Sequence, residues 1–348
     1  MKILITTVQV PFIRGGAEIL AEGLRDALRS AGHEAEIAAI PFKWYPPERI
    51  LDQMLACRLL DITESTGMAV DRVIGLKFPA YFIPHPNKVL WILHQHRTAY
   101  DLWDHTLGDL IHFPNGAQIR DAIREADARL IPEAKKIFTI SRTVSQRLKD
   151  SCGIDSTPLY HPPQDAEHFY CAAAEDYFFF PSRLTPLKRQ ALVLEALAGT
   201  CRPIRVRFAG PVEHPAYEAA LKARAQKLKV HSRVEWLGSV TEEEKRRQYA
   251  CALGIIYPPV NEDYGYVTLE AMLSSKPMIT CSDSGGPLEF VRPGKTGLIA
   301  ESTPEALAAA MDTLWDNRAQ AQAMGEAGRA HYDSQQICWP KVVERLLS

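Results

Sequence analysis

The sequence predicts an α/β fold built from parallel sheets, because short apolar runs alternate along the chain with longer segments of helical period. The runs are rich in β-branched residues, and glycines or prolines stand at many of their ends. At 348 residues the chain exceeds the size of one small core, so we expect two domains. The alternation occurs in both halves, which indicates two doubly wound sheets in series.

The first half opens with an expected strand over Lys2–Val8, and a loop with two glycines follows it. Residues 17–31 then carry apolar side chains at helical spacing, and Gly32 is typical of a helix C-terminus. The stretch 41–86 shows no period that assigns it. The other elements expected in this half are strands at 36–40, 89–93 and 137–140 and a helix from Thr143.

The second half repeats the alternation more clearly, because prolines stand at the ends of its apolar runs. Segments of helical period separate these runs, as crossover helices do in a parallel sheet. Strands are expected at 177–181, 206–209, 234–237, 254–257, 278–281 and 297–300.

Residues 160–169 include two adjacent prolines and show no periodicity, which indicates the approach to a linker. We therefore expect an N-terminal domain over 1–165 and a C-terminal domain over 173–333. Doubly wound sheets bind ligands outside the carboxyl ends of their strands. Two such domains facing each other would place a site in the cleft between them.

Charge and cysteine content exclude several classes of protein. The chain has 40 Lys plus Arg against 42 Asp plus Glu, whereas non-specific binding of nucleic acid needs a basic surplus. The seven cysteines form no CxxC pair and fit thiols in a reducing compartment. No signal-peptide pattern and no apolar run of about 18 residues is found. We expect a soluble, cytoplasmic enzyme.

The strongest motif is NEDYGYVTLEAM at 261–272, which follows an apolar strand and leads into a helical pattern. If the helix begins near Tyr266, its first amides form an anion site, and Gly265 lets a phosphate approach the backbone. Glu262 then lies in the loop and Glu270 in the second helical turn, where both can accept hydrogen bonds from ligand hydroxyls. A solvated loop acid plus a surface helix acid is the alternative interpretation.

Two cations, Arg183 and Lys188, follow the apolar run at 177–181. A strand-to-helix turn with fixed positive charge suits a diphosphate, because it stabilises developing negative charge. The alternative is an exposed basic helix start. Arg189 is expected to be the solvent-facing member of the group.

Several other patterns fail. The GKT at 294–296 ends like a P-loop, but Glu289 stands where the first glycine is required. His94 and His96 alternate at a strand end, yet no third metal ligand is indicated. The sequence has no D-x-D pair, no hydrolase elbow and no G-x-G-x-x-G fingerprint, so neither a metal-bridged diphosphate nor a dinucleotide is expected.

Six motifs follow one another along the chain. They are GGAE at 15–18, ISRTVSQRL at 140–148, PSR-x4-K at 181–188, VRFAGP at 206–211, E-x7-E at 262–270 and SGGPLEFVRPGKTGLI at 284–299. In this order they resemble the motifs of the retaining glycosyltransferases of family 4, which have the GT-B fold. The resemblance extends over essentially the whole chain and implies two Rossmann-like domains. It also implies that residues 334–348 form a last helix that returns to the N-terminal domain, with Trp339 as its anchor.

The resemblance implies transfer of a hexose-type sugar from a UDP- or GDP-linked donor to a hydroxyl acceptor, with retention and without a metal or cofactor. Arg183 and Lys188 would neutralise the diphosphate. Glu262 would bind the transferred sugar, and His94 would lie near it. These four residues form the implied catalytic set. The implied donor-binding residues are Gly16, Gly210, Gly265, Tyr266, Val267 and Glu270, the last of them at the ribose.

The segment 94–105, HQHRTAYDLWDH, is more polar and aromatic than the family leads us to expect. An acceptor pocket is one interpretation. A helix that packs Tyr100 and Trp103 into the N-terminal core is the other. The expected acceptor contacts are Gly15, His96, Arg97 and Tyr100.

The expected partners are a nucleotide-sugar donor and a glycan, lipid-linked or small-molecule acceptor, with no nucleic acid. Peripheral contact with the inner face of a membrane is compatible with such an acceptor. The alternative functions are a nucleotide-sugar epimerase or a phosphorylase of the same architecture, or a nucleotide-sugar-binding scaffold without turnover. No residue is identified as the lysine that would hold a phosphorylase cofactor, and the combination of Arg183, Lys188, Glu262 and Glu270 argues against the scaffold.

Overall fold

The computed structural model describes all 348 residues, which form two units. Unit 1 consists of residues 1–164 together with 338–348, and unit 2 consists of residues 165–337. The division between Gln164 and Asp165 falls inside the proline-containing stretch 160–169.

Unit 1 is built on a six-stranded sheet in the order β2-β1-β5-β6-β7-β8, and every neighbouring pair is parallel. A short antiparallel pair, β3 with β4, stands apart from it. The strands are β1 (Lys2–Gln9), β2 (Glu34–Pro41), β3 (Glu64–Ser65), β4 (Met68–Ala69), β5 (Arg72–Gly75), β6 (Lys88–Ile92), β7 (Lys136–Thr139) and β8 (Thr157–Pro158).

The helices of unit 1 bury apolar residues, and in α1 they lie on the face that the sequence period predicts. In α1 the buried positions include Leu20, Leu24 and Leu28, which recur every four residues. The N-terminus of α4 is capped by Ser141, whose hydroxyl accepts a hydrogen bond from the Val144 amide at 3.0 Å. The helices are α1 (Gly16–Ser30), α2 (Glu48–Leu59), α3 (Gly116–Leu130), α4 (Arg142–Cys152) and α11 (Trp339–Leu347).

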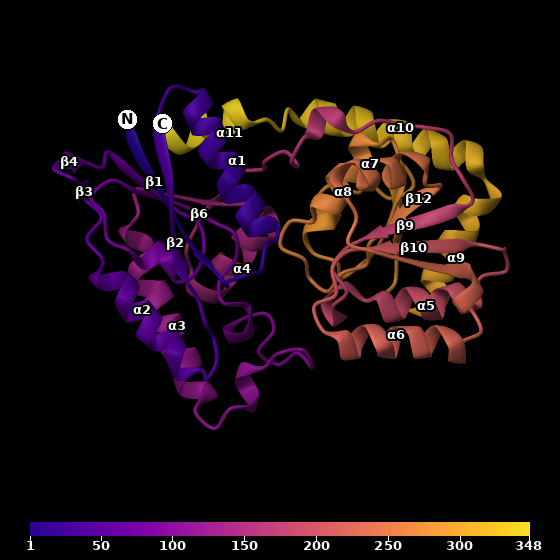
Figure 1. Cartoon of the computed structure of the whole chain (residues 1–348), viewed down its shortest axis with the longest axis horizontal. Coiled ribbons are helices and arrows are strands. Elements are labelled where there is room, and N and C mark those ends of the chain that lie inside the picture. The colour runs from indigo at the N-terminus through magenta and orange to yellow at the C-terminus, as the bar shows by residue number, and fades with distance from the viewer. The chain divides into compact units, whose positions relative to one another are not determined.

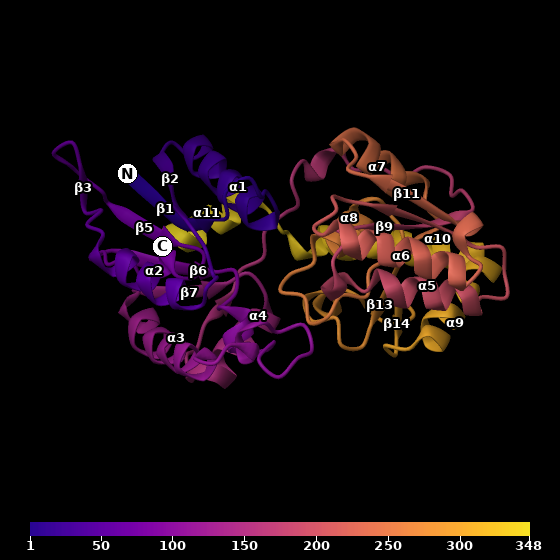
Figure 2. The same ribbon diagram turned by 60° about the horizontal axis from the view of Figure 1, so that its bottom comes forward.

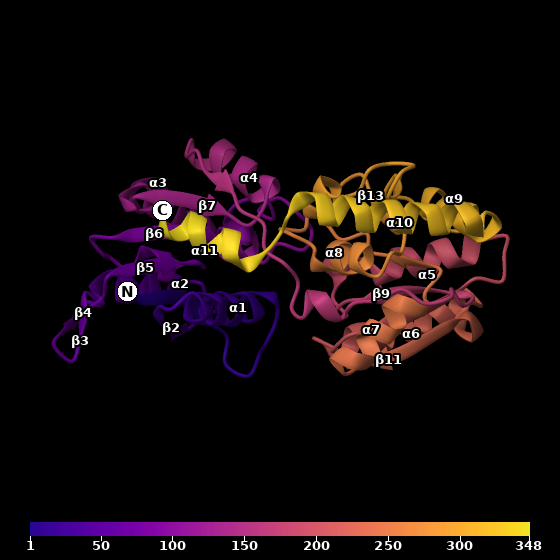
Figure 3. The same cartoon turned by 90° about the horizontal axis from the view of Figure 1, so that it is seen from above.

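The C-terminal helix α11 packs on α1 and lies beside β7 (Figures 1 and 3). Gly23 of α1 permits this contact, because a Cβ atom there would lie only 2.5 Å from the Trp339 ring. At the other end of the helix, Arg72 donates a hydrogen bond to the Leu346 carbonyl at 2.7 Å. The segment that belongs to unit 1 begins at Cys338 rather than at 334, since α10 of unit 2 continues to Gln335.

Unit 2 has a six-stranded parallel sheet in the order β11-β10-β9-β12-β13-β14 (Figure 2). Numbered within the unit, this is the Rossmann order 3-2-1-4-5-6. The strand order reverses between β9 and β12, and open α/β sheets bind ligands at that point, outside the carboxyl ends of the strands. The strands are β9 (Tyr177–Pro181), β10 (Arg205–Ala209), β11 (Val234–Gly238), β12 (Gly254–Ile256), β13 (Met278–Cys281) and β14 (Gly297–Ala300).

Helices cover both faces of this sheet, with α5 and α6 on one side and α7, α8 and α10 on the other (Figure 1). The central strand β9 is therefore apolar on both faces, and Phe178, Phe179 and Phe180 are fully buried. The helices are α5 (Gln190–Gly199), α6 (Pro215–Lys227), α7 (Glu242–Cys251), α8 (Tyr266–Leu273), α9 (Pro304–Asp316) and α10 (Arg318–Gln335).

The structure confirms the predicted α/β class and every strand expected from the sequence, with ends shifted by at most two residues. It also assigns the stretch 41–86, for which the sequence predicted no element. There α2 buries Ile50, Met54 and Cys57, and β5 provides a strand of four residues. None of the helices combines the length and apolar character needed to cross a bilayer.

Candidate active site

Three loops meet where the strand order of unit 2 reverses. They are the β9 loop (residues 182–189), the β12 loop (257–265) and the β13 loop (282–286). Backbone hydrogen bonds join them: the Val260 amide donates to the Leu187 carbonyl at 2.8 Å, and the Glu262 amide donates to the Ser284 carbonyl at 2.8 Å. Most of the residues that the sequence selected in unit 2 lie on these loops or directly after them.

Lys188 and Glu262 form an ion pair at the centre of this group. The Lys188 ammonium also donates a hydrogen bond to the Tyr257 hydroxyl at 2.8 Å. The side chains of Lys188 and Glu262 are 13% and 21% exposed, so both remain accessible to a ligand. Burial, followed by the charge of Glu262, raises the pKa of Tyr257 well above its usual value and keeps the phenol neutral.

Arg183 lies at the rim of the same group and is half exposed. Its guanidinium stands 3.8 Å from the Glu213 carboxylate. Its positive charge also lowers the pKa of Tyr257, against the larger effects of burial and Glu262. The β9 loop passes close to Gly210, where a Cβ atom would lie 2.2 Å from the Ser182 carbonyl oxygen. Gly210 also has a φ of 149°, so only glycine fits here without displacing the loop that carries Arg183.

Helix α8 begins at Tyr266, as the motif predicts. Gly265 precedes it in the left-handed conformation, with a φ of 82°, and a Cβ atom at this position would lie 2.9 Å from the Pro287 ring. The first amides of α8, at Tyr266 and Val267, therefore stand at the end of the β12 loop, which also carries Glu262. A helix N-terminus in this position favours a negatively charged ligand.

Glu270 lies in the second turn of α8 and is 7% exposed. Its two carboxylate oxygens accept hydrogen bonds from Lys245 at 3.1 Å and from Tyr249 at 2.6 Å, both on α7. Burial lowers the pKa of the Lys245 ammonium, but the nearby carboxylates of Glu270 and Glu242 raise it by more. The pKa of Lys245 therefore lies above its usual value. Since an ionised carboxylate offers about four acceptor positions, Glu270 keeps capacity for ligand hydroxyls.

The expectation that Arg189 faces solvent is wrong. Its side chain is 21% exposed, whereas that of Arg183 is 45% exposed. The guanidinium donates two hydrogen bonds to the Asp283 carboxylate, at 2.7 and 2.6 Å. The β13 loop supplies this carboxylate, and the distance of 94 residues along the chain explains why the sequence alone does not indicate the pair.

In unit 1, the residues selected near the N-terminus lie at the start of α1. Gly15 is the N-cap of the helix, and its amide donates a hydrogen bond to the Glu18 carboxylate at 2.8 Å. Gly16 is the first helical residue. His94 lies two residues beyond the end of β6, where its Nδ1 is 2.6 Å from the Gln95 carbonyl oxygen. These residues follow the carboxyl ends of β1 and β6.

His96 belongs to an aromatic cluster after β2, β5 and β6. Its ring lies 5.3 Å from that of Phe78 and 6.3 Å from that of Phe42, which stacks on Trp44. Burial lowers the pKa of His96 to about 4, so the imidazole is neutral at pH 7. Arg97 donates two hydrogen bonds to the Asp101 carboxylate, at 3.1 and 2.7 Å.

No α-helix forms over 94–105; the segment folds as a short 3-10 turn, Arg97–Ala99, followed by further turns. It nevertheless directs an aromatic side chain inward. Tyr100 donates a hydrogen bond to Asp127 at 2.7 Å, and Trp103 packs under Arg120. The structure thus supports the packing interpretation for Tyr100 while correcting the element that achieves it.

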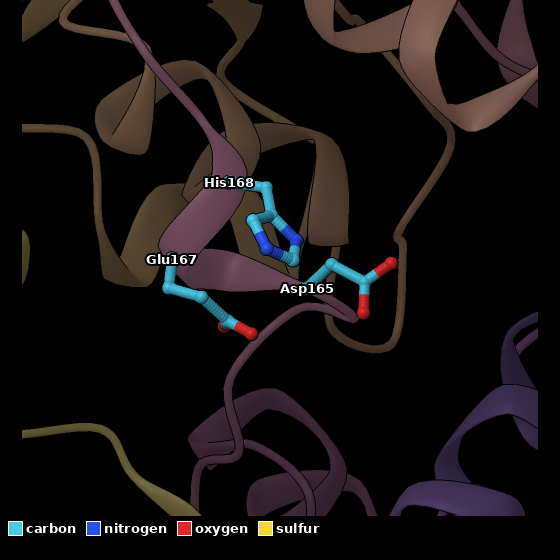
Figure 4. A group of neighbouring side chains, drawn as sticks. All are labelled: Asp165, Glu167 and His168. Carbon is cyan, nitrogen blue, oxygen red and sulfur yellow. The ribbon is translucent and has the colours of Figure 1, made fainter.

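A second group of ligating side chains lies at the start of unit 2. Asp165, Glu167 and His168 bring one ligand atom each to within 4.8 Å of one another (Figure 4). The Arg246 guanidinium stands 3.7 Å from the Asp165 carboxylate and supplies positive charge there. Glu167 and His168 are exposed, and we assign no ion to this group.

Four residues of this site lie outside the sequence-based selection: Tyr257, Lys245, Tyr249 and Asp283. Lys245 and Tyr249 have an i, i+4 spacing on α7, which placed them on one face of that helix. Nothing in the local sequence indicated that this face meets Glu270. Tyr257 stands at the end of an apolar run, so the sequence predicts a core residue there.

The fold and this site define a class of protein with two Rossmann-like units and a charged site at the switch point of the second. Residues 172–331 match the model of the family described as "Glycosyl transferases group 1". Unit 2 is thus similar over most of its length to the group 1 glycosyl transferases. The chain as a whole has the GT-B fold.

Two curated relatives illustrate the match. The chain is 31% identical over 212 residues to "D-rhamnosyltransferase WbpZ" of Pseudomonas aeruginosa, which covers 59% of this chain and 54% of that protein. It is 24% identical over 185 residues to "O-antigen chain mannosyltransferase C" of Escherichia coli, and this match covers 52% of the present chain and 48% of that protein. The chain thus spans about half the length of these relatives.

Solved structures extend the likeness in fold over the whole chain. HepE of Anabaena, in complex with UDP-glucose, has a TM-score of 0.74 at 17% identity and covers 100% of this chain and 98% of its own. Sucrose-phosphate synthase of Thermosynechococcus elongatus has a TM-score of 0.78 at 16% identity, covering 99% and 97%.

Proposed function

We propose that the protein is a retaining, metal-independent glycosyltransferase that moves a hexose-type sugar from a UDP- or GDP-linked donor to a hydroxyl acceptor. The observation that carries the proposal is the Lys188–Glu262 pair at the switch point of unit 2, on the loops that follow β9 and precede α8, in a region that matches the group 1 model. Relatives named as rhamnosyl- and mannosyltransferases support a hexose-type sugar. The complex of HepE with UDP-glucose supports a nucleotide-linked donor.

Each charged residue then has a role toward the donor. Lys188 and Arg183 bind the diphosphate, and the amides of Tyr266 and Val267 at the start of α8 add to this cradle. Glu262 accepts hydrogen bonds from hydroxyls of the transferred sugar, and Glu270 accepts them from the ribose. Because Lys188 and Arg183 supply the positive charge, the diphosphate needs no metal ion in this mechanism.

In the reaction the bond between the anomeric carbon and the diphosphate oxygen breaks, and the acceptor oxygen bonds to the same face of that carbon. The acceptor proton passes to the leaving diphosphate. Lys188 and Arg183 stabilise the negative charge that develops as the diphosphate leaves, which is electrostatic stabilisation by a preorganised site. His94 contributes to the position of the sugar.

We assign the acceptor to unit 1, with Gly15, His96 and Arg97 as its contacts. Large apolar side chains are exposed on the same unit, including Phe12 of the β1–α1 loop and Leu55 and Leu59 of α2. They support contact with a membrane surface and therefore a lipid-linked acceptor. The seven cysteines are all free thiols, which supports a cytoplasmic protein.

A transfer assay with Lys188→Ala tests this function. Wild type supplied with a UDP- or GDP-hexose should release nucleoside diphosphate only when a hydroxyl acceptor is present. An epimerase would convert the donor without acceptor, and a scaffold would convert nothing. We expect kcat to fall by about 100- to 1000-fold in Lys188→Ala, because a charge-stabilising donor is lost. Near wild-type turnover of this variant would contradict the assignment.

A further inference from the structure

Arg189 stands at a conformationally unfavourable position directly after Lys188. Its φ is 59°, in the left-handed region where a residue with a Cβ atom is disfavoured and glycine is not. Its carbonyl accepts a hydrogen bond from the Val193 amide, so the residue also begins α5. Such a conformation persists only where the surrounding structure holds it. The contacts of the side chain show what that structure is.

The Arg189 guanidinium spans from the β9 loop to the β13 loop. It binds both oxygens of Asp283, at 2.7 and 2.6 Å, in the bidentate geometry that gives the strongest and most directional ion pairs. Ser302 donates a further hydrogen bond of 2.5 Å to the Asp283 carboxylate, and its hydroxyl also accepts one from Arg189 at 3.4 Å. The Arg189 side chain is 21% exposed, which limits screening by solvent.

This pair completes a ring of contacts around Glu262. The β9 and β12 loops are joined by the hydrogen bond from Val260 to Leu187. The β12 and β13 loops are joined where Glu262 pairs with both Ser284 and Gly286, at 2.8 and 2.7 Å. The β9 and β13 loops follow strands that flank β12, and the Arg189–Asp283 pair connects them directly.

We infer that the Arg189–Asp283 ion pair is a positioning device that locks the β9 and β13 loops together and thereby sets Lys188 against Glu262. Neither residue touches the donor. The inference rests on the proposed function, since it names what holds the diphosphate-binding lysine in place. An oriented cation matters most when charge develops on the leaving group, so loss of the pair should lower kcat more than it raises the donor KM.

Arg189→Gly tests the inference, because glycine adopts the positive φ without strain and only the side-chain contacts are lost. Lys229→Gly is the matched control for the glycine substitution: Lys229 also has a positive φ, of 57°, but its side chain is exposed and it lies after α6, away from the three loops. We expect kcat of Arg189→Gly to fall about tenfold with a donor KM within about twofold of wild type. Lys229→Gly should keep wild-type kinetics.

A double variant separates positioning from a general loss of charge. If the pair acts as a unit, Arg189→Gly combined with Asp283→Asn should be no slower than either single variant. Fully multiplicative losses in the double variant would overturn the inference, as would wild-type kcat in Arg189→Gly.

Amide hydrogen exchange provides a readout that needs no activity. Exchange in residues 257–265 and 282–286 should accelerate in Arg189→Gly and remain at the wild-type rate in Lys229→Gly. Unchanged exchange would overturn the positioning role even if the enzyme were active. If exchange accelerates in Arg189→Gly but the wild-type protein transfers no sugar, the positioning role of the pair is supported and only the proposed function is contradicted.

Discussion

Lys188 is held between a carboxylate, Glu262, and a neutral phenol, Tyr257. A diphosphate that binds this ammonium therefore competes with Glu262 for it. Binding of the donor would release the Glu262 carboxylate to accept hydrogen bonds from the sugar, so the ion pair couples the two halves of the donor site.

The buried carboxylate of Asp127 gives a pH-dependent prediction. It is fully buried and accepts hydrogen bonds from Tyr81, Tyr100 and Gln95 without a cation among these partners. Burial outweighs these hydrogen bonds and raises the pKa of Asp127 to about 6. Because the folded state then holds its proton more tightly than the unfolded state, the contribution of Asp127 to stability falls as pH rises from about 4 to about 6.

Asp127→Asn, which stays neutral, should therefore gain stability relative to wild type over that pH range. The difference in unfolding free energy should change by up to about 3 kcal/mol, since one pKa unit corresponds to about 1.4 kcal/mol. Urea titrations of both proteins between pH 4 and 7 measure it. A difference that is constant with pH would show that the carboxylate titrates normally.

The sequence identifies these residues better than it identifies their partners. Lys188, Glu262 and Glu270 stand out because their charges flank apolar strands or a helix start, and these positions depend only on local order along the chain. Their contacts with Tyr257, Lys245 and Tyr249 depend on how α7 and α8 pack together. Local spacing carries no information on that packing, and the same limit explains why Arg189 was expected to face solvent.

At the scale of elements, buried parallel strands are the easiest to predict, because both of their faces are apolar. The run YFFFP of β9 is buried throughout and agrees with its predicted bounds. The sequence predicts no element over 41–86 because the elements there are neither long buried strands nor helices with a clear apolar face. There β5 has four residues, and α2 exposes Leu55 and Leu59 on the face where a helical pattern predicts polar residues.

The contact between α1 and α11 gives a prediction about stability. Gly23→Ala would place a methyl group 2.5 Å from the rigid Trp339 ring, so one of the two helices must shift. Such overpacking costs about 1–3 kcal/mol, and the melting temperature should fall accordingly.

Gly199→Ala in α5 is the control, because its new Cβ atom would lie 3.6 Å from Ala308, an ordinary contact. This variant should be neutral or slightly stabilised. Equal melting temperatures for Gly23→Ala and wild type would mean that α11 does not pack on α1 through Trp339.

At the scale of the whole molecule, the order of motifs along the chain correctly predicted the GT-B fold. The strand order of unit 2 adds what the motifs do not contain, because it places the β9 and β12 loops side by side at the switch point. Charges that lie 74 residues apart in sequence thus form one site. The segment 94–105 of unit 1 shows the opposite case, since it folds as turns without a regular period and the sequence alone does not predict its conformation.

On the function proposed above, unit 2 binds a nucleoside diphosphate and places its ribose against Glu270. The most direct test is a thermal-shift panel with UDP, GDP, ADP and dTDP on wild type and Glu270→Ala, each measured against its own ligand-free melting temperature. One nucleotide at about 100 times its Kd should stabilise wild type by roughly 2.7 kcal/mol and leave Glu270→Ala almost unchanged. If no nucleotide shifts wild type, or if the variant shifts equally, the claim is contradicted.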